Sequence, residues 1–296
     1  MISYAYVVDL DLGQLDALSA AVAEGTFEAA ARCLHITPSA VSQRIKALET
    51  AVGRVLLTRS KPVHPTPSGQ TLLRVARQLQ TITAEAALEL GTWPSDLTAV
   101  IPVAVNADSL ATWFLPALAA VGPSCFFDLH RSDQDQTAEL LRDGTVMAAV
   151  TAQAEPVPGC TVQRLGRMRY RPRAAPSFAV NWFPNGPTAA ALAEAPLVCF
   201  DRQDQLQDRY LRRHSRRRLY PPRHYVPGLA EYAQAIWLGL GWGMLPDLRT
   251  PPGDLVDFDP GHHIDVTLYW QQWRLRTVVL DRLSEAIQQA SAGKLH

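Results

Sequence analysis

Helix-start and helix-stop signals follow one another so closely in residues 12–52 that only a compact group of short helices fits them. Apolar residues recur at helical spacing from 12 to 22, and Gly25 then ends the first helix. Thr26 is a good N-cap for a second helix. Only two residues separate the end of this second helix from the pair Thr37-Pro38. In that pair, Thr37 caps a third helix and Pro38 takes its first position. Two short helices joined by a tight turn predict a helix-turn-helix.

The third helix is amphipathic, with one face suited to a core and the other to a polar partner. Val41, Ile45, Leu48 and Val52 lie on its apolar side. The opposite side carries groups able to bond phosphates or base edges, namely Ser39, Ser42, Gln43 and Lys46, with Arg44 beside them. This face predicts a surface for the major groove of DNA. The alternative is an ordinary solvated face in a small helical bundle.

Local charge favours the nucleic-acid interpretation, although the whole chain has 28 basic and 28 acidic residues. Residues 32–77 hold eight basic side chains and a single acid, Glu49. The segment 56–66 is basic and rich in proline, as a two-stranded wing beside the helices would be. Thr66-Pro67 repeats the cap-plus-proline signal and opens a helix that continues to about Leu90 with an apolar stripe. Dimerisation would bury that stripe.

These residues resemble a known family. The motifs are Leu12-x-x-Leu15, Gly25-Thr26-Phe27-x-x-Ala30-Ala31, Thr37-Pro38-Ser39-Ala40-Val41-Ser42-Gln43-Arg44-Ile45-x-x-Leu48-Glu49, Leu56-Leu57-x-Arg59 and Thr66-x-x-Gly69. They look like the winged helix-turn-helix of LysR-type transcriptional regulators. The variant that begins at Thr37-Pro38 resembles the ArgP/LysG branch, which responds to lysine and arginine. The resemblance extends to Gly239-Leu240-Gly241-Trp242-Gly243-Met244-Leu245-Pro246 and Leu268-Tyr269-Trp270-Gln271-Gln272-Trp273.

The remaining two thirds of the chain show alternating strand and helix signals. Strand-like runs at Val100–Val105, Cys125–Leu129 and Val146–Val150 alternate with helical segments, which predicts βαβ units and a parallel sheet. We expect two α/β lobes with a ligand between them, and the resemblance implies a regulatory region like a periplasmic binding protein. The fold class is therefore α/β with an N-terminal winged helix-turn-helix.

The expected domains are a DNA-binding domain at 1–66, a linker and dimerisation helix at 67–92 and a regulatory domain at 93–296. In the regulatory domain, lobe I takes about 98–167 and 267–296, and lobe II about 168–266.

Polar residues at the ends of predicted strands are the candidates for binding an effector. Asp108 and Ser109 stand where a strand turns into a helix, so the hydroxyl and free amides there could bind a carboxylate. The analogous positions after later strands give Thr151, Phe200 and Asp201. A basic effector also needs a carboxylate partner, for which the candidates are Asp108, Asp135, Asp201 and Asp204. The alternative for each is a helix cap.

The sequence shows few features of an enzyme, a metalloprotein or a membrane protein. No G-x-S-x-G, G-x-x-x-x-G-K-[ST] or G-x-G-x-x-G motif is present, so no catalytic site and no cofactor are expected. The motif His262-His263-x-Asp265 contains possible metal ligands, but adjacent histidines ahead of a strand point to opposite faces. No third ligand lies at a suitable spacing in the sequence, so no metal site is expected. The four cysteines form no C-x-x-C pair. No spanning segment or signal peptide is evident, which predicts a cytoplasmic protein without a membrane partner.

The sequence thus predicts a regulator that binds a double-stranded DNA operator. Ser39, Ser42 and Gln43 are expected to contact bases, with Pro38 setting the approach, and the backbone contacts are assigned to Thr37, Arg44, Lys46, Arg59 and Lys61. The resemblance implies lysine or arginine as effector, a basic-amino-acid exporter gene as target, a homodimer or tetramer, and RNA polymerase as a candidate partner. The alternatives are another small effector, or an architectural or replication-origin-binding protein without ligand response.

Overall fold

The structure is a computed structural model that describes residues 10–58, 60–90, 100–122, 125–132, 134–249, 253–275 and 277–296. Within these ranges the side chains of 84, 85, 88, 89 and 134–136 are not described. No helix in the described ranges is both long and apolar enough to cross a lipid bilayer.

Three short helices form the N-terminal head, as the sequence predicted: α1 (Leu12–Glu24), α2 (Phe27–Cys33) and α3 (Pro38–Val52). Thr26 and Thr37 cap α2 and α3 as predicted, and Asp11 caps α1 as well; each side chain accepts a hydrogen bond from the backbone amide three residues later. Gly25 adopts φ 70°, the left-handed conformation that ends α1. The apolar faces bury a common core that includes Leu15, Leu18, Val41, Ile45 and Leu48.

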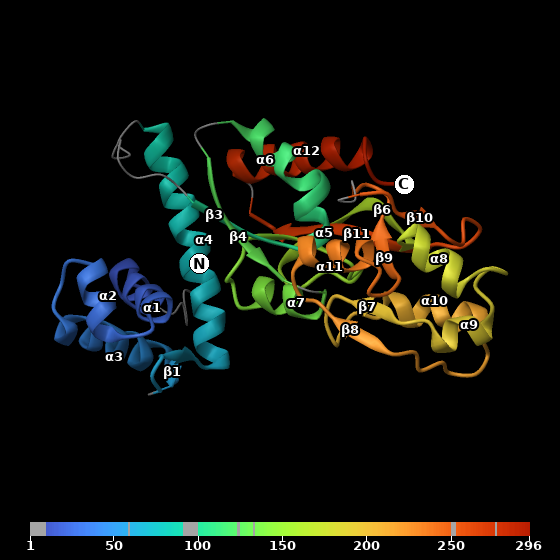
Figure 1. Cartoon of the computed structure of the whole chain (residues 1–296). Coiled ribbons are helices and arrows are strands. Elements are labelled where there is room, and N and C mark those ends of the chain that lie inside the picture. The colour runs from blue at the N-terminus through green and yellow to red at the C-terminus, as the bar shows by residue number, and fades with distance from the viewer. Residues whose placement is uncertain are drawn as a thin grey trace.

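A small hairpin and a long helix follow the head. The hairpin consists of β1 (Leu57–Thr58) and β2 (His64–Pro65), which pair antiparallel. Helix α4 (Pro67–Glu89) then stands between the head and the rest of the molecule (Figure 1). It contacts both sides, since Gln80 Nε2 donates to Asp16 Oδ1 at 2.7 Å and Arg77 Nη1 donates to the Gly144 carbonyl. The helix therefore links the head physically to the following α/β region.

The α/β region begins with the predicted parallel strands. Strands β3 (Val100–Val105), β4 (Phe126–Arg131) and β5 (Ala148–Thr151) are parallel, with β3 in the middle. The helical segments of this lobe are α5 (Ala107–Ser109), the π-helix η1 (Leu110–Phe114), α6 (Leu115–Val121), α7 (Gln134–Arg142) and α12 (Val278–Ala292). Of these, α6 and α12 cover one face of the sheet and α7 covers the other (Figure 1).

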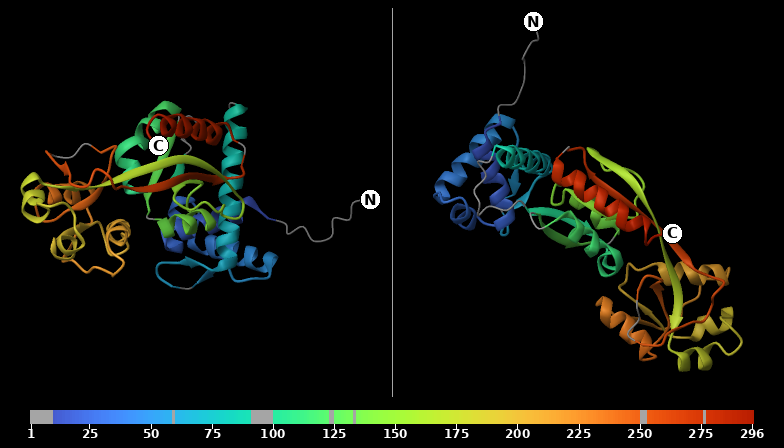
Figure 2. Two further views of the ribbon diagram at one scale, coloured as in Figure 1. Left: turned by 90° about the vertical axis from the view of Figure 1, so that its right-hand side faces the viewer. Right: turned by 90° about the horizontal axis from the view of Figure 1, so that it is seen from above.

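Two long antiparallel strands connect this lobe to a second one. Strands β6 (Cys160–Ala174) and β11 (Ile264–Trp273) pair along the whole of β11 and run side by side from lobe to lobe (Figure 2). Strand β6 was not predicted, and the seven-stranded sheet is mixed rather than wholly parallel because β11 pairs antiparallel with both β5 and β6. The chain therefore crosses between the lobes twice, and the last segment returns to the first lobe.

The second lobe is built around β6, β9 (Gly243–Pro246) and a two-stranded parallel sheet of β7 (Leu197–Cys199) and β8 (Arg223–Tyr225). Trp242 is fully buried beside Tyr210 and Phe258 in its core. Its other elements are α8 (Pro176–Trp182), α9 (Ala189–Glu194), α10 (Leu206–His214), α11 (Leu229–Trp237) and β10 (Val256–Asp257).

Candidate functional site

The exposed face of α3 carries the residues predicted to read DNA. Val41, Ile45 and Leu48 are buried against the other helices, which turns the opposite side of α3 to solvent. The exposed residues there include Pro38, Ser39, Ser42, Gln43 and Lys46. The structure thus places base-reading candidates on one continuous surface, which is what insertion into a major groove requires.

The residues predicted to contact the DNA backbone differ from one another in exposure and in hydrogen bonding. Thr37 Oγ1 is occupied as the N-cap of α3, accepting from Ala40 N at 3.2 Å, and lies 2.9 Å from Ser39 Oγ. Arg44 is half-buried and its Nη1 donates to the Gly13 carbonyl at 3.5 Å, so its guanidinium lies against α1. Lys61 is exposed between β1 and β2. Arg59 lies outside the described residues.

A cavity of about 350 Å³ lies between the two lobes of the α/β region. Lobe I contributes the start of the helix that follows β3, and lobe II contributes the loop that follows β7 and the start of α10. Polar side chains dominate the lining, which includes Asn106, Asp108, Tyr170, Asp201, Gln203, Asp204, Gln205, Arg209 and Tyr232, together with Phe200, Leu206, Leu229 and Met244. A cavity of this size and polarity suits a small polar ligand.

Three of the predicted aspartates line this cavity in different settings. Asp108 Oδ2 accepts from Tyr170 Oη at 2.8 Å. Asp204 mostly orders its own loop, because Oδ2 accepts from Phe200 N and Oδ1 from Leu206 N, at 3.1 and 3.0 Å. Asp201 Oδ1 accepts from the amides of Gln203 and Asp204 at 2.7 and 2.8 Å. Asp201 and Asp204 therefore cap the approach to α10 as well as lining the cavity.

The other predicted effector residues are placed differently. Phe200 lines the cavity, whereas Ser109 and Thr151 are not among its lining residues. Ser109 is fully buried, and its Oγ makes no hydrogen bond to any described residue. Thr151 Oγ1 accepts from Gln153 N at 3.1 Å, so it orders the turn after β5. The side chain of Asp135 lies outside the described part of the chain.

Two groups in the cavity lining would be stabilised by contact with a ligand. The buried Oδ1 atom of Asn106 has no hydrogen-bond partner among the described residues, so a ligand donor would satisfy it. Burial lowers the pKa of Arg209, and the neighbouring Arg213 and Arg212 lower it further. An anionic group beside Arg209 would offset this repulsion. Among the described residues, the cavity lining thus offers three carboxylates, one amide acceptor without a partner and one cation.

Family profiles match both parts of the molecule. Residues 12–70 match the bacterial regulatory helix-turn-helix protein of the lysR family, and residues 99–292 match the LysR substrate binding domain. The chain belongs to the LysR family. Its relatives are transcriptional regulators, so this LysR-family chain is a DNA-binding regulator and not an enzyme.

Individual relatives of this LysR-family chain are similar over nearly its full length. The transcriptional regulator LysG of Mycobacterium tuberculosis is 44% identical over 291 residues, which cover 96% of this chain and 94% of the relative. The crystal structure of ArgP from Mycobacterium tuberculosis superposes with a TM-score of 0.89 at 44% identity, covering 97% of this chain and 99% of that one. Full-length LysG from Corynebacterium glutamicum, with bound effector Arg, gives a TM-score of 0.79 at 36% identity over 97% and 100% of the two chains.

Sequence reasoning missed two tyrosines of the LysR-family cavity. Tyr170 comes from β6, where outward arginines at 167, 169, 171 and 173 alternate with more buried residues, a period of two that predicts a strand. Tyr232 lies in α11, and its Oη accepts from Met244 N and Gln207 Nε2, each at 3.0 Å. The alternation was a usable signal for Tyr170, whereas no local pattern marks Tyr232.

Seven arginines between residues 208 and 223 form a basic cluster in the second lobe, and part of its charge is neutralised. Arg223 forms a bidentate pair with Asp208, with Nη1 to Oδ2 at 3.1 Å. Arg209 faces the cavity, and Arg213 Nη1 donates to the His263 carbonyl. Arg212, Arg216, Arg217 and Arg218 are exposed. The cluster is therefore a mixture of structural, cavity-lining and solvent-facing arginines.

Proposed function

We propose that this regulator binds a basic amino acid, lysine or arginine, in the cavity between its lobes. The observation that carries the proposal is the charge of the lining, in which Asp108, Asp201, Asp204 and one cation, Arg209, are the charged side chains among the described residues. A zwitterion with a cationic side chain has two positive groups and one negative group, which matches this arrangement. LysG of Corynebacterium glutamicum, whose structure holds the effector Arg, supports the same ligand class.

The orientation of the ligand follows from where the charges lie. Arg209 suits the ligand carboxylate, because an anion there relieves repulsion from the neighbouring arginines. Asp108 and Asp201 suit the ammonium or guanidinium groups, and Asn106 Oδ1 accepts a further donor. Asp204 contributes its charge while holding the loop that leads into α10.

On the DNA side, Ser39, Ser42 and Gln43 contact operator bases, and Pro38 sets their approach. Thr37, Lys46, Lys61 and Arg59 contact the phosphate backbone, and Arg44 reaches it from the side of α3 that faces α1. Support comes from the exposure of the base-reading residues on one face. Helix α4 pairs subunits into a homodimer, and two dimers form a tetramer. Ligand-driven closure of the lobes then changes the spacing of the heads along the operator.

The regulated gene encodes an exporter of basic amino acids. RNA polymerase is the partner through which the regulator acts at the promoter of this gene. LysG of Corynebacterium glutamicum is named as a lysine export regulatory protein, which supports this assignment.

Calorimetric titration of the full chain with lysine, arginine and citrulline tests the proposed effector. Citrulline has the shape of arginine without its charge, so we expect arginine or lysine to bind and citrulline to bind at least ~10-fold more weakly, a loss of about 1.4 kcal/mol. Asp108→Asn keeps an acceptor for Tyr170 and should remove most of this preference. Asp128→Asn, at an exposed carboxylate outside the cavity lining, is the matched control. Equal binding of arginine and citrulline would point to another small effector, and no binding of any amino acid to an architectural protein.

A further inference from the structure

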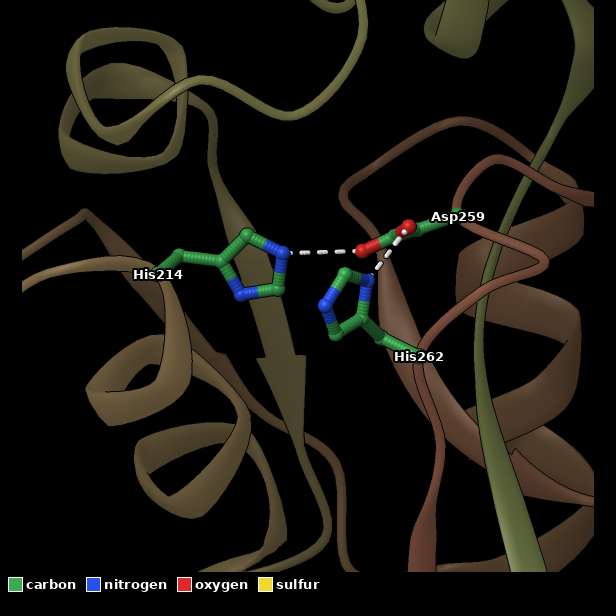
Figure 3. Close-up of side chains that lie close together, drawn as sticks. All are labelled: His214, Asp259 and His262. Atoms are coloured by element: carbon green, nitrogen blue, oxygen red, sulfur yellow. Dashed lines mark hydrogen bonds and ion pairs between the residues drawn. The ribbon is translucent and has the colours of Figure 1, made fainter.

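Three side chains converge in the second lobe, away from the cavity lining. His214 is the last residue of α10, and Asp259 and His262 lie in the turn between β10 and β11. His214 Nε2 lies 2.8 Å from Asp259 Oδ2, and His262 Nδ1 lies 2.9 Å from Asp259 Oδ1 (Figure 3). The three ligand atoms lie within 4.8 Å of one another, and no other group of His, Cys, Asp or Glu in the described part of the chain comes together in this way.

The hydrogen bonding of His214 leaves its other nitrogen facing a carboxylate. His214 Nδ1 lies 3.2 Å from the carbonyl oxygen of Tyr210, an acceptor that only an Nδ1–H can satisfy. In a neutral imidazole, Nε2 then carries a lone pair that faces Asp259 Oδ2. Two electron pairs at this distance repel each other unless a second proton or a cation lies between them. An Nδ1–H donated to a backbone carbonyl is also the usual second contact of a metal-binding histidine.

The turn presents Asp259 and His262 together. His262 N donates to the Asp259 carbonyl at 3.0 Å, which closes the four-residue turn Asp259-Pro260-Gly261-His262. The Asp259 carboxylate is oriented by Tyr210, whose Oη donates to Oδ2 at 2.6 Å. The two carboxylate oxygens also face His214 Nε2 and His262 Nδ1. Asp259 is therefore an oxygen ligand that its neighbours already hold in one orientation.

Two arginines lie near the turn, and one of them, Arg213, donates from Nη1 to the His263 carbonyl on the solvent side. Arg171 approaches the turn, where Nη1 donates to the Pro260 carbonyl at 3.2 Å. Two carboxylates balance the charge of Arg171: its Nε lies 3.0 Å from Asp247 Oδ1, and its Nη1 lies 3.2 Å from Asp257 Oδ2. The side chains of Asp259 and His214 are each 12% exposed, whereas that of His262 is 50% exposed. The site thus has two nearly buried ligands and one open side from which a cation and water can enter.

We propose that His214 Nε2, His262 Nδ1 and the Asp259 carboxylate bind a divalent transition-metal cation of the zinc class. Two imidazole nitrogens and one carboxylate oxygen are ligands that suit Zn²⁺, with a water molecule as the fourth ligand on the exposed side. The hydrogen-bond distances need to open by only a few tenths of an ångström to admit metal–ligand bonds of about 2.0–2.2 Å. The cation fastens the C-terminal end of α10 to the turn before β11. Because Leu206 and Arg209 at the other end of α10 line the effector cavity, the metal stabilises one wall of that cavity from outside.

The test is a titration of tag-free, full-length protein with ZnCl₂ after removal of metals with EDTA. We expect one high-affinity Zn²⁺ per chain by calorimetry, a higher melting temperature with Zn²⁺, and the visible absorption of four-coordinate Co²⁺ when Co²⁺ replaces it. His262→Ala should weaken Zn²⁺ binding by ~100-fold or more, because it removes a direct ligand. The loss of a residue that only hydrogen-bonds to a metal ligand already lowers metal affinity by about 10–100-fold. His262 is half exposed, so this variant should fold normally.

His263→Ala is the matched control, because Nε2 of this neighbouring histidine lies 3.6 Å from Asp265 Oδ1 and the side chain is not part of the three-residue group. It should bind Zn²⁺ like the wild type. Asp259→Asn provides a second variant that should lose the Co²⁺ spectrum while circular dichroism stays unchanged. The proposal is overturned if the wild type binds no Zn²⁺ at one equivalent, or if His262→Ala and His263→Ala bind it equally. In either case the three side chains form imidazole–carboxylate hydrogen bonds alone.

Discussion

The hydroxyl of Tyr170 donates to Asp108 Oδ2 at 2.8 Å, which joins the connecting strand β6 to the first helical turn after β3. Burial raises the pKa of Tyr170 well above its ordinary value, and the charge of Asp108 raises it further, so the phenol stays a donor at all physiological pH. The contact fixes one carboxylate of the proposed effector site from the strand that also connects the two lobes.

Tyr170→Phe should therefore weaken the binding of arginine or lysine. The substitution leaves Asp108 without its tyrosine donor, and a hydrogen bond to a charged group is worth about 1.5–3 kcal/mol. We expect the Kd measured by calorimetry to rise ~10-fold or more. Tyr220→Phe, at a side chain that is 72% exposed, is the control and should bind as the wild type does. An unchanged Kd for Tyr170→Phe would show that Asp108 does not contact the ligand.

Substitutions in the head should separate base reading from phosphate binding. Gln43→Ala should lower the preference for the operator by about 1–3 kcal/mol at one base pair, because a side chain that bonds a base edge is lost. Lys61→Ala should weaken all DNA sequences alike and reduce the slope of log K against log salt by about 1. Fluorescence anisotropy with operator and scrambled duplexes at several salt concentrations distinguishes the two. If Gln43→Ala keeps full sequence preference, α3 does not read bases through this residue.

The junction between the head and α4 should be intolerant of a single methyl group. A Cβ atom at Gly69 would lie 2.0 Å from the carbonyl oxygen of Leu56, which is backbone and already accepts from Thr66 N at 2.8 Å. Gly69→Ala must therefore displace α4 from the wing, and we expect a loss of about 1–3 kcal/mol of unfolding free energy. Urea denaturation measures it. At Gly293 a Cβ atom would lie 4.0 Å from the carbonyl oxygen of Gln289, which is ordinary van der Waals contact, so Gly293→Ala should change stability by less than about 0.5 kcal/mol.

The helices of the head could be predicted because their signals are local. Caps such as Thr26 and Thr37 and the apolar spacing on α3 act within one or two turns, so the sequence displays them directly. The parallel strands β3, β4 and β5 were equally visible as apolar runs. Strand β6 was missed although its arginines alternate with buried residues, since it lacks the continuous apolar run that marks the parallel strands.

The candidate site was only partly predictable because it depends on contacts between distant segments. Asp108, Asp201 and Asp204 stood at strand ends, where a general rule for α/β folds applies, and they line the cavity. Tyr170 and Arg209 reach it only through the crossing of β6 and the packing of α10. The His214–Asp259–His262 cluster shows the same limit, since His214 lies 45 residues before Asp259 and no spacing rule connects them.

The pair of Asp208 and Arg223 should make part of the stability of the second lobe depend on pH. Hydrogen bonds from Arg223 lower the pKa of Asp208 although partial burial acts against them. A carboxylate with a lowered pKa in the folded state contributes stability that is present above its unfolded pKa, about 3.9, and is lost as the pH falls through the lower folded value. Asp208→Asn should therefore cost about 1–2 kcal/mol of unfolding free energy at pH 7, with this cost shrinking below about pH 4. Urea titrations of both proteins between pH 7 and pH 3 measure the difference, and a cost that stays constant with pH would contradict the assigned ion pair.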